Sequence, residues 1–374
     1  MLAQPPVWFV IIAFICALGP LIVIHELGHY WVARLFGVGA ESFSIGFGHE
    51  IFGWTDKRNT RWKIGWLPLG GYVRFVGDEN VASAPATDTA PEDQQFSFHN
   101  KPVWKRFLIV LAGPLANFCL AILIFAVFFA TIGAPRTSNS VVTLLRGSPA
   151  QVAGIKPGDR IVAIADRSTP TFEDIAQVVL MRPAEHVPIV VERGGQTIRL
   201  QAVIGVHEQV DRFGQHYRIG RIGIYGGTRT YVRLPVTELL PAAASYTLRT
   251  TRGMIDGLWQ IVTGRRSVKE LGGPVKIAQI AGQQASLGFE DFILLVALLS
   301  INLGFINLLP VPMLDGGHLF FYSIEALRRR PVSPQAQEWA FRGGLAAILT
   351  LLLFVTFNDL GSIGVWDRLQ RLIG

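Results

Sequence analysis

Two histidines and a glutamate stand together at one end of an apolar run, in the order His25-Glu26-Leu27-Gly28-His29. On a helix, residues i and i+4 share a face, so both imidazoles could bind one metal ion. Glu26 could then reach a water molecule on that metal. The alternative is a pair of polar residues capping a helix, but ionisable groups beside an apolar span are costly unless they bind or pair. The spacing therefore predicts a catalytic zinc site with Glu26 as its base.

A catalytic zinc usually has three protein ligands and one open position, so a third ligand must come from elsewhere. The candidate is Asp315, which follows Pro310 and Pro312 and precedes two glycines. Taken alone, Asp-Gly-Gly could be an interfacial turn. Counted from the outer ends of their spans, however, His25 and Asp315 should reach a similar depth. His318 is a rival ligand, for which a structural or supporting role is the preferred interpretation.

These residues need long apolar helices to position them, and the sequence supplies four candidate segments. Half of the 374 residues are hydrophobic and only 16% are charged, which is typical of a membrane protein. A helix needs ~20 apolar residues to cross the hydrocarbon layer. The first segment lacks a basic leader and a cleavage site, so we expect it to be retained. The segments are residues 6–24, 107–132, 292–309 and 345–357, the last being short unless 339–344 joins it.

Basic residues in the short loops predict the orientation of these spans. No Lys or Arg precedes Arg34, nine lie from Arg34 to Arg106, and three more are at 328–330. Both loops should therefore be cytoplasmic, with the two termini and residues 134–290 on the far side. The net charge of +7 comes without a nucleic-acid motif, so no nucleic-acid partner is expected. Cys16 and Cys119 lie in apolar spans and are interpreted as packing residues.

Between the spans, the pattern predicts a β region, a linker and a small folded module. Residues 42–47 and 61–66 alternate like strands, and Gly70-Gly71 predicts a turn before a further strand over 72–75. Residues 81–95 resemble a linker. From about 136 to 227 the composition is that of a mostly β module, followed by helical stretches over 238–263 and toward 285.

Polar groups inside the spans are further candidates for contact with a substrate. Asn302 and Asn307 lie in the third span, where an amide is costly unless it binds or packs. Helix packing is the alternative for both residues. For Asn117, in the second span, packing is the preferred interpretation. The strand of Tyr72, Val73, Arg74 and Phe75 could add to an unwound substrate by β-pairing.

Five motifs in order resemble the site-2 protease family of intramembrane metalloproteases, in particular the bacterial regulator of sigma-E protease type. The resemblance covers nearly the whole chain. Besides the motifs at 25–29 and 314–316, it rests on 68–73, on Gly113 to Phe118, and on 147–150 with 153–159, which are similar to a PDZ domain.

The resemblance implies a zinc ion held by His25, His29 and Asp315, with Glu26 as the catalytic base. It also implies a membrane-dipping β-hairpin over about 41–75 that pairs with substrate, and it favours Asn307 as a substrate contact. The chain has room for one PDZ module where well-known members have two. That module could bind a newly exposed C-terminus or exclude substrates with bulky outer domains.

The expected fold is a polytopic α-helical membrane protein with four transmembrane helices, a membrane-associated β-hairpin region and one small β-rich PDZ domain. The expected setting is the bacterial inner membrane, with both termini and the PDZ domain periplasmic and the active site toward the cytoplasm. The resemblance implies single-span membrane substrates such as an anti-sigma factor, and remnant signal peptides. A transporter or channel and a membrane scaffold are the rival functions.

These expectations divide the chain into consecutive segments. The predicted segments are 1–36, a span with the paired histidines; 37–80, the β region; 81–103, a cytoplasmic linker; 104–134, the second span; 135–230, the PDZ domain; 231–290, a helical region; 291–320, the third span with Asp315; 321–338, a cytoplasmic loop; and 339–374, the fourth span with the C-terminus.

Overall fold

The computed structural model describes residues 5–77, 94–136, 138–210, 216–226, 230–264, 268 and 271–362. Most of the predicted linker at 81–103 therefore lies outside the described residues. The chain divides into two compact units, one formed by 1–125 with 273–357 and the other by 126–272 with 358–374. Each unit is considered by itself.

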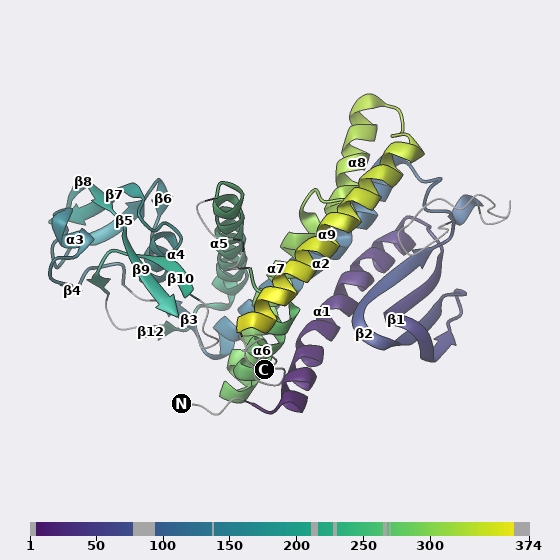
Figure 1. Ribbon diagram of the computed structural model, residues 1–374, viewed down its shortest axis with the longest axis horizontal. Helices are drawn as coiled ribbons and strands as arrows, with labels where there is room; N and C mark the ends of the chain where they lie inside the picture. The colour runs from purple at the N-terminus through teal and green to yellow at the C-terminus, as the bar shows by residue number, and fades with distance from the viewer. Residues whose placement is uncertain are drawn as a thin grey trace, which may run out of the picture. The chain divides into compact units, whose positions relative to one another are not determined.

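Four helices are long and apolar enough to cross a membrane, which confirms a polytopic membrane protein (Figure 1). They are α1 (Val7–Leu35), α2 (Val103–Thr131), α7 (Phe289–Leu308) and α9 (Pro334–Ser362). Large apolar side chains such as Ile12 and Leu353 are exposed on them, as expected for helices that face lipid. Residues 339–344 do join the fourth helix, which makes it long enough to span.

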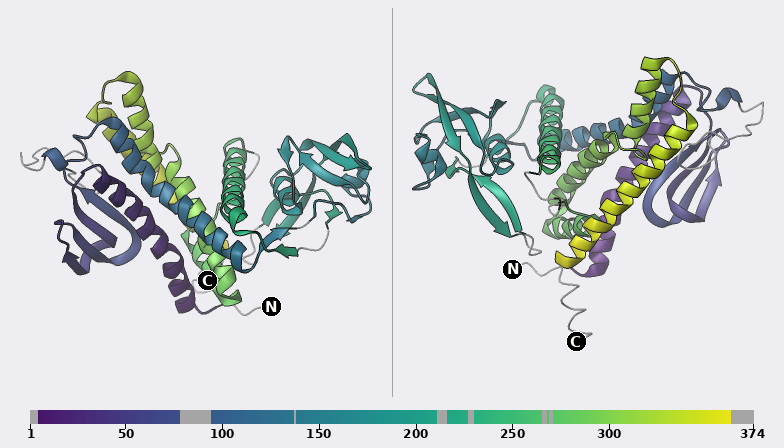
Figure 2. Two further views of the ribbon diagram at one scale, coloured as in Figure 1. Left: turned by 180° about the vertical axis from the view of Figure 1, so that it is seen from behind. Right: turned by 45° about the horizontal axis from the view of Figure 1, so that its top comes forward.

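The first unit also contains a curled β-hairpin that lies along α1 in the two views of Figure 2. Its strands are β1 (Ala40–Thr55) and β2 (Arg61–Phe75), followed by the short 3-10 helix η1 (Gln94–Phe96). Residues 42–45 of β1 pair both with 71–74 and with 61–64, so the hairpin folds back on itself. Residues 61–64 run in the same direction as 42–45, whereas residues 71–74 run in the opposite direction, so β2 reverses between these two stretches. This agrees with the turn predicted at Gly70-Gly71, where Gly70 has a φ of 119°.

Two shorter helices complete the first unit, α6 (Pro274–Leu287) and α8 (Asp315–Arg328). The segment predicted as a third span over 291–320 contains the end of one helix and the start of another. Helix α7 ends at Leu308, and α8 continues through the start of the predicted loop. The cause lies in Pro310 and Pro312, which cannot continue a helix and force a break before Asp315.

Two apolar clusters hold this unit together. One joins α1 to α6 and α7 through Ala13, Ala17, Leu21, Ala281 and Val296. The small alanines allow these helices to approach closely, which is how membrane helices commonly pack. The other cluster joins the C-terminal part of α1, the N-terminal part of α2, the hairpin and α8. Its buried residues include Tyr30, Phe43, Phe75, Phe98, Ile109 and Leu319. This second cluster surrounds the histidine end of α1.

The second unit contains a small, mostly β module, as the composition predicts. A four-stranded sheet has the order β6-β5-β7-β8, and its core includes Ile161, Ile164, Ile189 and Val191. The strands of this unit are β3 (Ala134–Arg136), β4 (Thr143–Leu144), β5 (Arg160–Ile164), β6 (Arg167–Ser168), β7 (His186–Arg193), β8 (Gln196–Val203), β9 (Gly205–Val210), β10 (His216–Arg221), β11 (Ile224–Tyr225) and β12 (Thr230–Val232). Its helices are α3 (Pro149–Val152), α4 (Phe172–Leu180) and α5 (Val236–Val262).

Candidate metal centre

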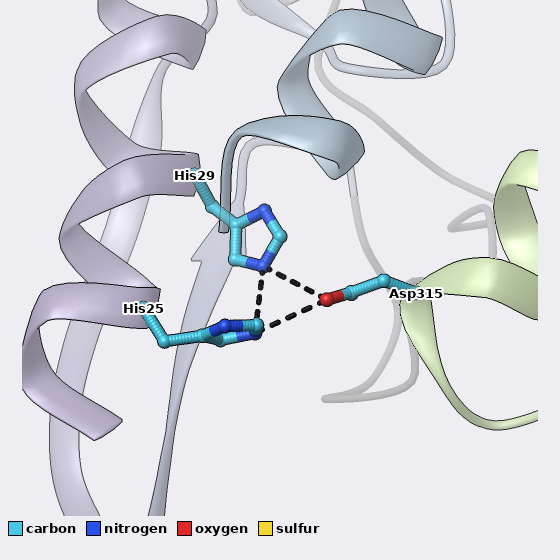
Figure 3. Close-up of side chains that lie close together, drawn as sticks. All are labelled: His25, His29 and Asp315. Atoms are coloured by element: carbon cyan, nitrogen blue, oxygen red, sulfur yellow. Dashed lines mark hydrogen bonds and ion pairs between the residues drawn. The ribbon is translucent and has the colours of Figure 1, made fainter. Parts of the chain in front are cut away.

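Three side chains from two separate segments converge on one point in the first unit (Figure 3). Nε2 of His25 lies 3.2 Å from Nε2 of His29. Oδ2 of Asp315 lies 3.1 Å from the first of these nitrogens and 3.5 Å from the second. All three residues are largely removed from solvent, so few water molecules can compete for these atoms.

The spacing of these three atoms fits zinc. Zinc binds imidazole nitrogen and carboxylate oxygen at about 2.0–2.2 Å in a tetrahedral arrangement, which places neighbouring ligand atoms about 3.3 Å apart. The observed separations of 3.1, 3.2 and 3.5 Å bracket that value. Oδ2 of Asp315 is buried against both imidazole nitrogens, and a cation between the three atoms would offset the cost of burying the carboxylate there. Two histidines and a carboxylate could thus hold one zinc ion and leave a position open.

Helix α1 presents the two imidazoles on one face and turns Glu26 toward the hairpin. A Cβ atom added to Gly71 of β2 would lie 3.2 Å from Cγ of Glu26, so the two segments touch there. The backbone of Val73 also makes a hydrogen bond with the Glu26 carboxylate. Glu26 is therefore held between the two histidines and the strand that lines the site.

Asp315 is the first residue of α8, and the turn before it is built to place it there. The chain folds back so tightly that a Cβ on Gly316 would lie 2.2 Å from the carbonyl oxygen of Leu309. A Cβ on Gly317 would lie 2.5 Å from that of Val311. Met313 has a φ of 82°, an uncommon conformation for a residue with a side chain. The two glycines therefore allow the turn that aims Asp315 at α1.

Helix α2 supports both imidazoles from behind, a role that the motifs alone did not reveal. Nδ1 of His29 lies 2.9 Å from the carbonyl oxygen of Ile109, which can only accept a hydrogen bond. Nδ1 of His25 lies 3.1 Å from the amide nitrogen of Asn117. Asn117 had been interpreted as a packing residue, and Ile109 contributes only backbone, so no side-chain pattern could have pointed to it.

A cavity of about 580 Å³ opens onto the three converging atoms. Most of the other residues predicted for the site line this cavity. Asn307 lines it, with its amide nitrogen 3.5 Å from Nε2 of His25. Asn302 is not among the residues that line it. The remaining lining residues include Glu26, Phe47, Tyr72, Val73, Phe75 and His318.

Two predicted candidates make contacts away from the point where His25, His29 and Asp315 converge. Arg74 is absent from the cavity wall and instead pairs with Glu41 across the hairpin, with 3.0 Å between Nε and Oε2. His318 lines the cavity, but its ring packs beside those of Tyr322 and Phe341 at centroid distances of 6.4 and 5.0 Å. The supporting role expected for His318 therefore stays a prediction.

Comparison with known proteins identifies a peptidase family over most of the chain. Residues 13–351 match the model described as "Peptidase family M50". Relatives named "Putative zinc metalloprotease" occur in Agrobacterium fabrum and Rhizobium meliloti. They are 43% and 42% identical over 361 residues, covering 94% of this chain and 96% of each relative. "Metalloprotease MmpA" of Caulobacter vibrioides is 37% identical over 391 residues, covering 97% of this chain and 98% of its own.

Proposed function

This chain belongs to peptidase family M50, the site-2 protease family of zinc metalloproteases, and we propose that it cleaves single-span membrane proteins within the bilayer. The observation that carries the proposal is the convergence of His25, His29 and Asp315 on one point beside a spanning helix, with Glu26 lining the same cavity. We assign the three converging residues as zinc ligands and Glu26 as the catalytic base.

Zinc, when bound, supplies a Lewis acid that lowers the pKa of water toward 7 and polarises a peptide carbonyl. The side chains of the site then have distinct tasks. Glu26 accepts the proton of the attacking water and delivers it to the leaving amine. The hydrogen bond from the backbone of Val73 and the contact with Gly71 hold the Glu26 carboxylate toward the cavity during both transfers.

The hairpin offers a way to present a substrate backbone. A peptide bond inside a transmembrane helix is protected by its own hydrogen bonds, so the helix must unwind and gain substitutes. Tyr72, Val73 and Phe75 of β2 line the cavity and could pair with an unwound strand of substrate. Asn307 offers an amide donor and acceptor on the opposite, helical wall. We propose that these groups bind the substrate backbone.

The substrate class and topology are also proposed. The family resemblance favours an anti-sigma factor and remnant signal peptides as substrates in a bacterial inner membrane. The basic loops favour periplasmic termini and an active site toward the cytoplasm. We assign residues 135–230 as one PDZ domain on the periplasmic side, supported by the motifs at 147–159 and by the mostly β architecture of this module.

The direct test measures cleavage of a panel of tagged single-span membrane proteins together with zinc content. Glu26→Gln should retain about one zinc per chain and lose a factor of about 10²–10⁴ in cleavage rate. Glu290→Gln is the matched control, since Glu290 is an exposed carboxylate in the first turn of α7, and it should cleave like the unaltered protein.

Other outcomes would reject specific parts of the proposal. Undiminished cleavage by Glu26→Gln would remove Glu26 from its role. A protein that holds zinc but cuts nothing in the panel would favour a scaffold, and one that also moves ions would favour a transporter. His25→Ala that still holds zinc with full affinity would reject the assigned ligand set.

A further inference from the structure

We propose that Asn117 is a positioning residue for the metal site. Its side-chain oxygen accepts the Nδ1 hydrogen of His25 and thereby fixes the tautomer that directs Nε2 toward zinc. This inference rests on the proposed role of His25 as a ligand. It assigns a task to an intramembrane amide that has no contact with the reacting atoms.

The first argument is the register between α1 and α2. Ile109, Gly113 and Asn117 are four residues apart and therefore lie on one face of α2. Along that face, Ile109 meets His29, Gly113 lies against the His29 ring, and Asn117 meets His25. Earlier residues of α2 contact later residues of α1, so the two helices run in opposite directions. One face of α2 thus contacts both imidazoles, at Nδ1 through Ile109 and Asn117 and along the edge of the His29 ring through Gly113.

The second argument comes from the tautomer of each histidine. The carbonyl oxygen of Ile109 has no hydrogen to donate, so Nδ1 of His29 must carry the proton and Nε2 is free to bind metal. Zinc-binding histidines usually donate their other nitrogen to an acceptor in this way. His25 needs the same arrangement because its Nε2 also faces Asp315. The only polar side chain placed at its Nδ1 within hydrogen-bond distance in the described structure belongs to Asn117.

The third argument is an unsatisfied atom. Oδ1 of Asn117 is buried and has no hydrogen-bond partner, while Nδ2 faces Nδ1 of His25 at 3.1 Å. A half-turn of the amide exchanges its two ends, and their assignment follows from the hydrogen-bond network. With Oδ1 toward His25, the orphan oxygen gains a donor and His25 gains its acceptor. A single rotation therefore satisfies both groups in the zinc-binding tautomer.

The surroundings of Asn117 hold this amide in place. The residue is fully buried, and its backbone carbonyl accepts a hydrogen bond from the hydroxyl of Ser300 in α7 at 2.8 Å. Ser300 is fully buried as well. Because this hydrogen bond ties α2 to α7 at the level of His25, the Asn117 side chain has a fixed origin. Packing alone would need no polar group here, where an unpaired amide is costly.

The experiment compares Asn117→Leu, Asn117→Ala and Asn117→Asp in the full chain. Zinc affinity is measured by competition with a chelator, and the geometry of the site is read from the visible spectrum of the cobalt(II)-substituted protein. Asn117→Leu keeps the volume but removes the acceptor, and should lower zinc affinity by about 10–100-fold and alter the cobalt spectrum. Asn117→Asp keeps an acceptor and should restore both to near the unaltered values.

Cys119→Leu is the matched control, since Cys119 lies on the same helix and is exposed. It should leave zinc affinity and the cobalt spectrum unchanged. Zinc affinity of Asn117→Leu within twofold of the unaltered protein, with the same cobalt spectrum, would overturn the inference. If Asn117→Leu does not fold, the difference between Asn117→Ala and Asn117→Asp decides in the same way.

Failure of this inference is distinguishable from failure of the proposed function. If His25→Ala loses zinc while every folded Asn117 variant keeps it, His25 remains a ligand and Asn117 is a packing residue. If His25→Ala itself keeps zinc, the assignment of the ligand set is at fault.

Discussion

Alanine in place of Gly113 should remove zinc from the site by crowding the metal-facing edge of the His29 ring. A Cβ at this position would lie 2.2 Å from Nε2 of His29, whereas non-bonded heavy atoms normally approach to about 3.5 Å. The imidazole of His29 would have to move by roughly 1 Å or more, or helices α1 and α2 would have to separate. The ring cannot move that far and keep both its 2.9 Å hydrogen bond to Ile109 and its approach to Asp315.

Two opposing contributions set the magnitude of this effect. Alanine favours a helix over glycine by about 1 kcal/mol, while overpacking costs about 1–3 kcal/mol. The net loss of folding stability should therefore be no more than about 2 kcal/mol, and the protein should still fold. Zinc affinity should fall at least about 10–100-fold, the loss typical when the support of a ligand is disturbed. Cleavage should fall with it.

Gly19→Ala is the matched control, because no atom lies within 4 Å of a Cβ at that position of α1. It should keep zinc and gain up to about 1 kcal/mol in stability. Zinc affinity is measured by chelator competition and stability by detergent-induced unfolding. Gly113→Ala that binds zinc within threefold of the unaltered protein would refute the reasoning, since the ring of His29 would then have room that the structure denies it.

Three further predictions test other parts of the molecule. Asp315→Asn keeps the shape of the ligand but removes its charge, so chelator competition should show zinc affinity reduced by at least about tenfold. Arg193 hydrogen-bonds to Asp159 at 2.6 and 2.7 Å and holds the pKa of Asp159 below its usual range. The stability that the ionised Asp159 gains from Arg193 is fully present above about pH 4 and is lost as pH falls through the lowered pKa of Asp159. Amide hydrogen exchange in β5 and β7 should therefore speed up as pH falls through that range. In Arg193→Gln the same increase should begin at a higher pH. Arg106 and Glu325 form a mostly buried ion pair at 2.8 Å. Arg106→Met leaves the Glu325 carboxylate buried without this partner, so the free energy of unfolding should fall by about 3 kcal/mol. The double variant with Glu325→Met should regain much of that loss.

The spans and the converging residues could be predicted because their signals are local or additive. A run of apolar residues reports a spanning helix whatever its neighbours are. The spacing of His25 and His29 places both imidazoles on one face, and the depth of Asp315 follows from counting along its span. The ends of the helices were less well predicted, since α9 begins at Pro334, before its purely apolar stretch, and thereby includes 339–344.

Asn302 and Asn307 show a feature of the site that could not be predicted from the sequence. Both are amides in the same apolar helix, and the same argument of cost applies to each. They are five residues apart, which turns them by about 140° around the helix axis. Only one of the two can therefore face the cavity, and it is Asn307 that does. Which face of α7 turns inward depends on its packing against other helices, which the spacing within α7 does not encode.

The support from α2 was less predictable still, because it depends on a backbone carbonyl, a missing side chain and an amide at one interface. Ile109 acts through an atom that every residue possesses, and Gly113 acts by having nothing beyond Cα. Neither role has a residue type as its signal. The proposed metal ligands come from α1 and α8, yet the groups that face Nδ1 of both imidazoles come from α2. The helix contacts that assemble this unit are therefore part of the chemistry of the site as much as the side chains that meet in it.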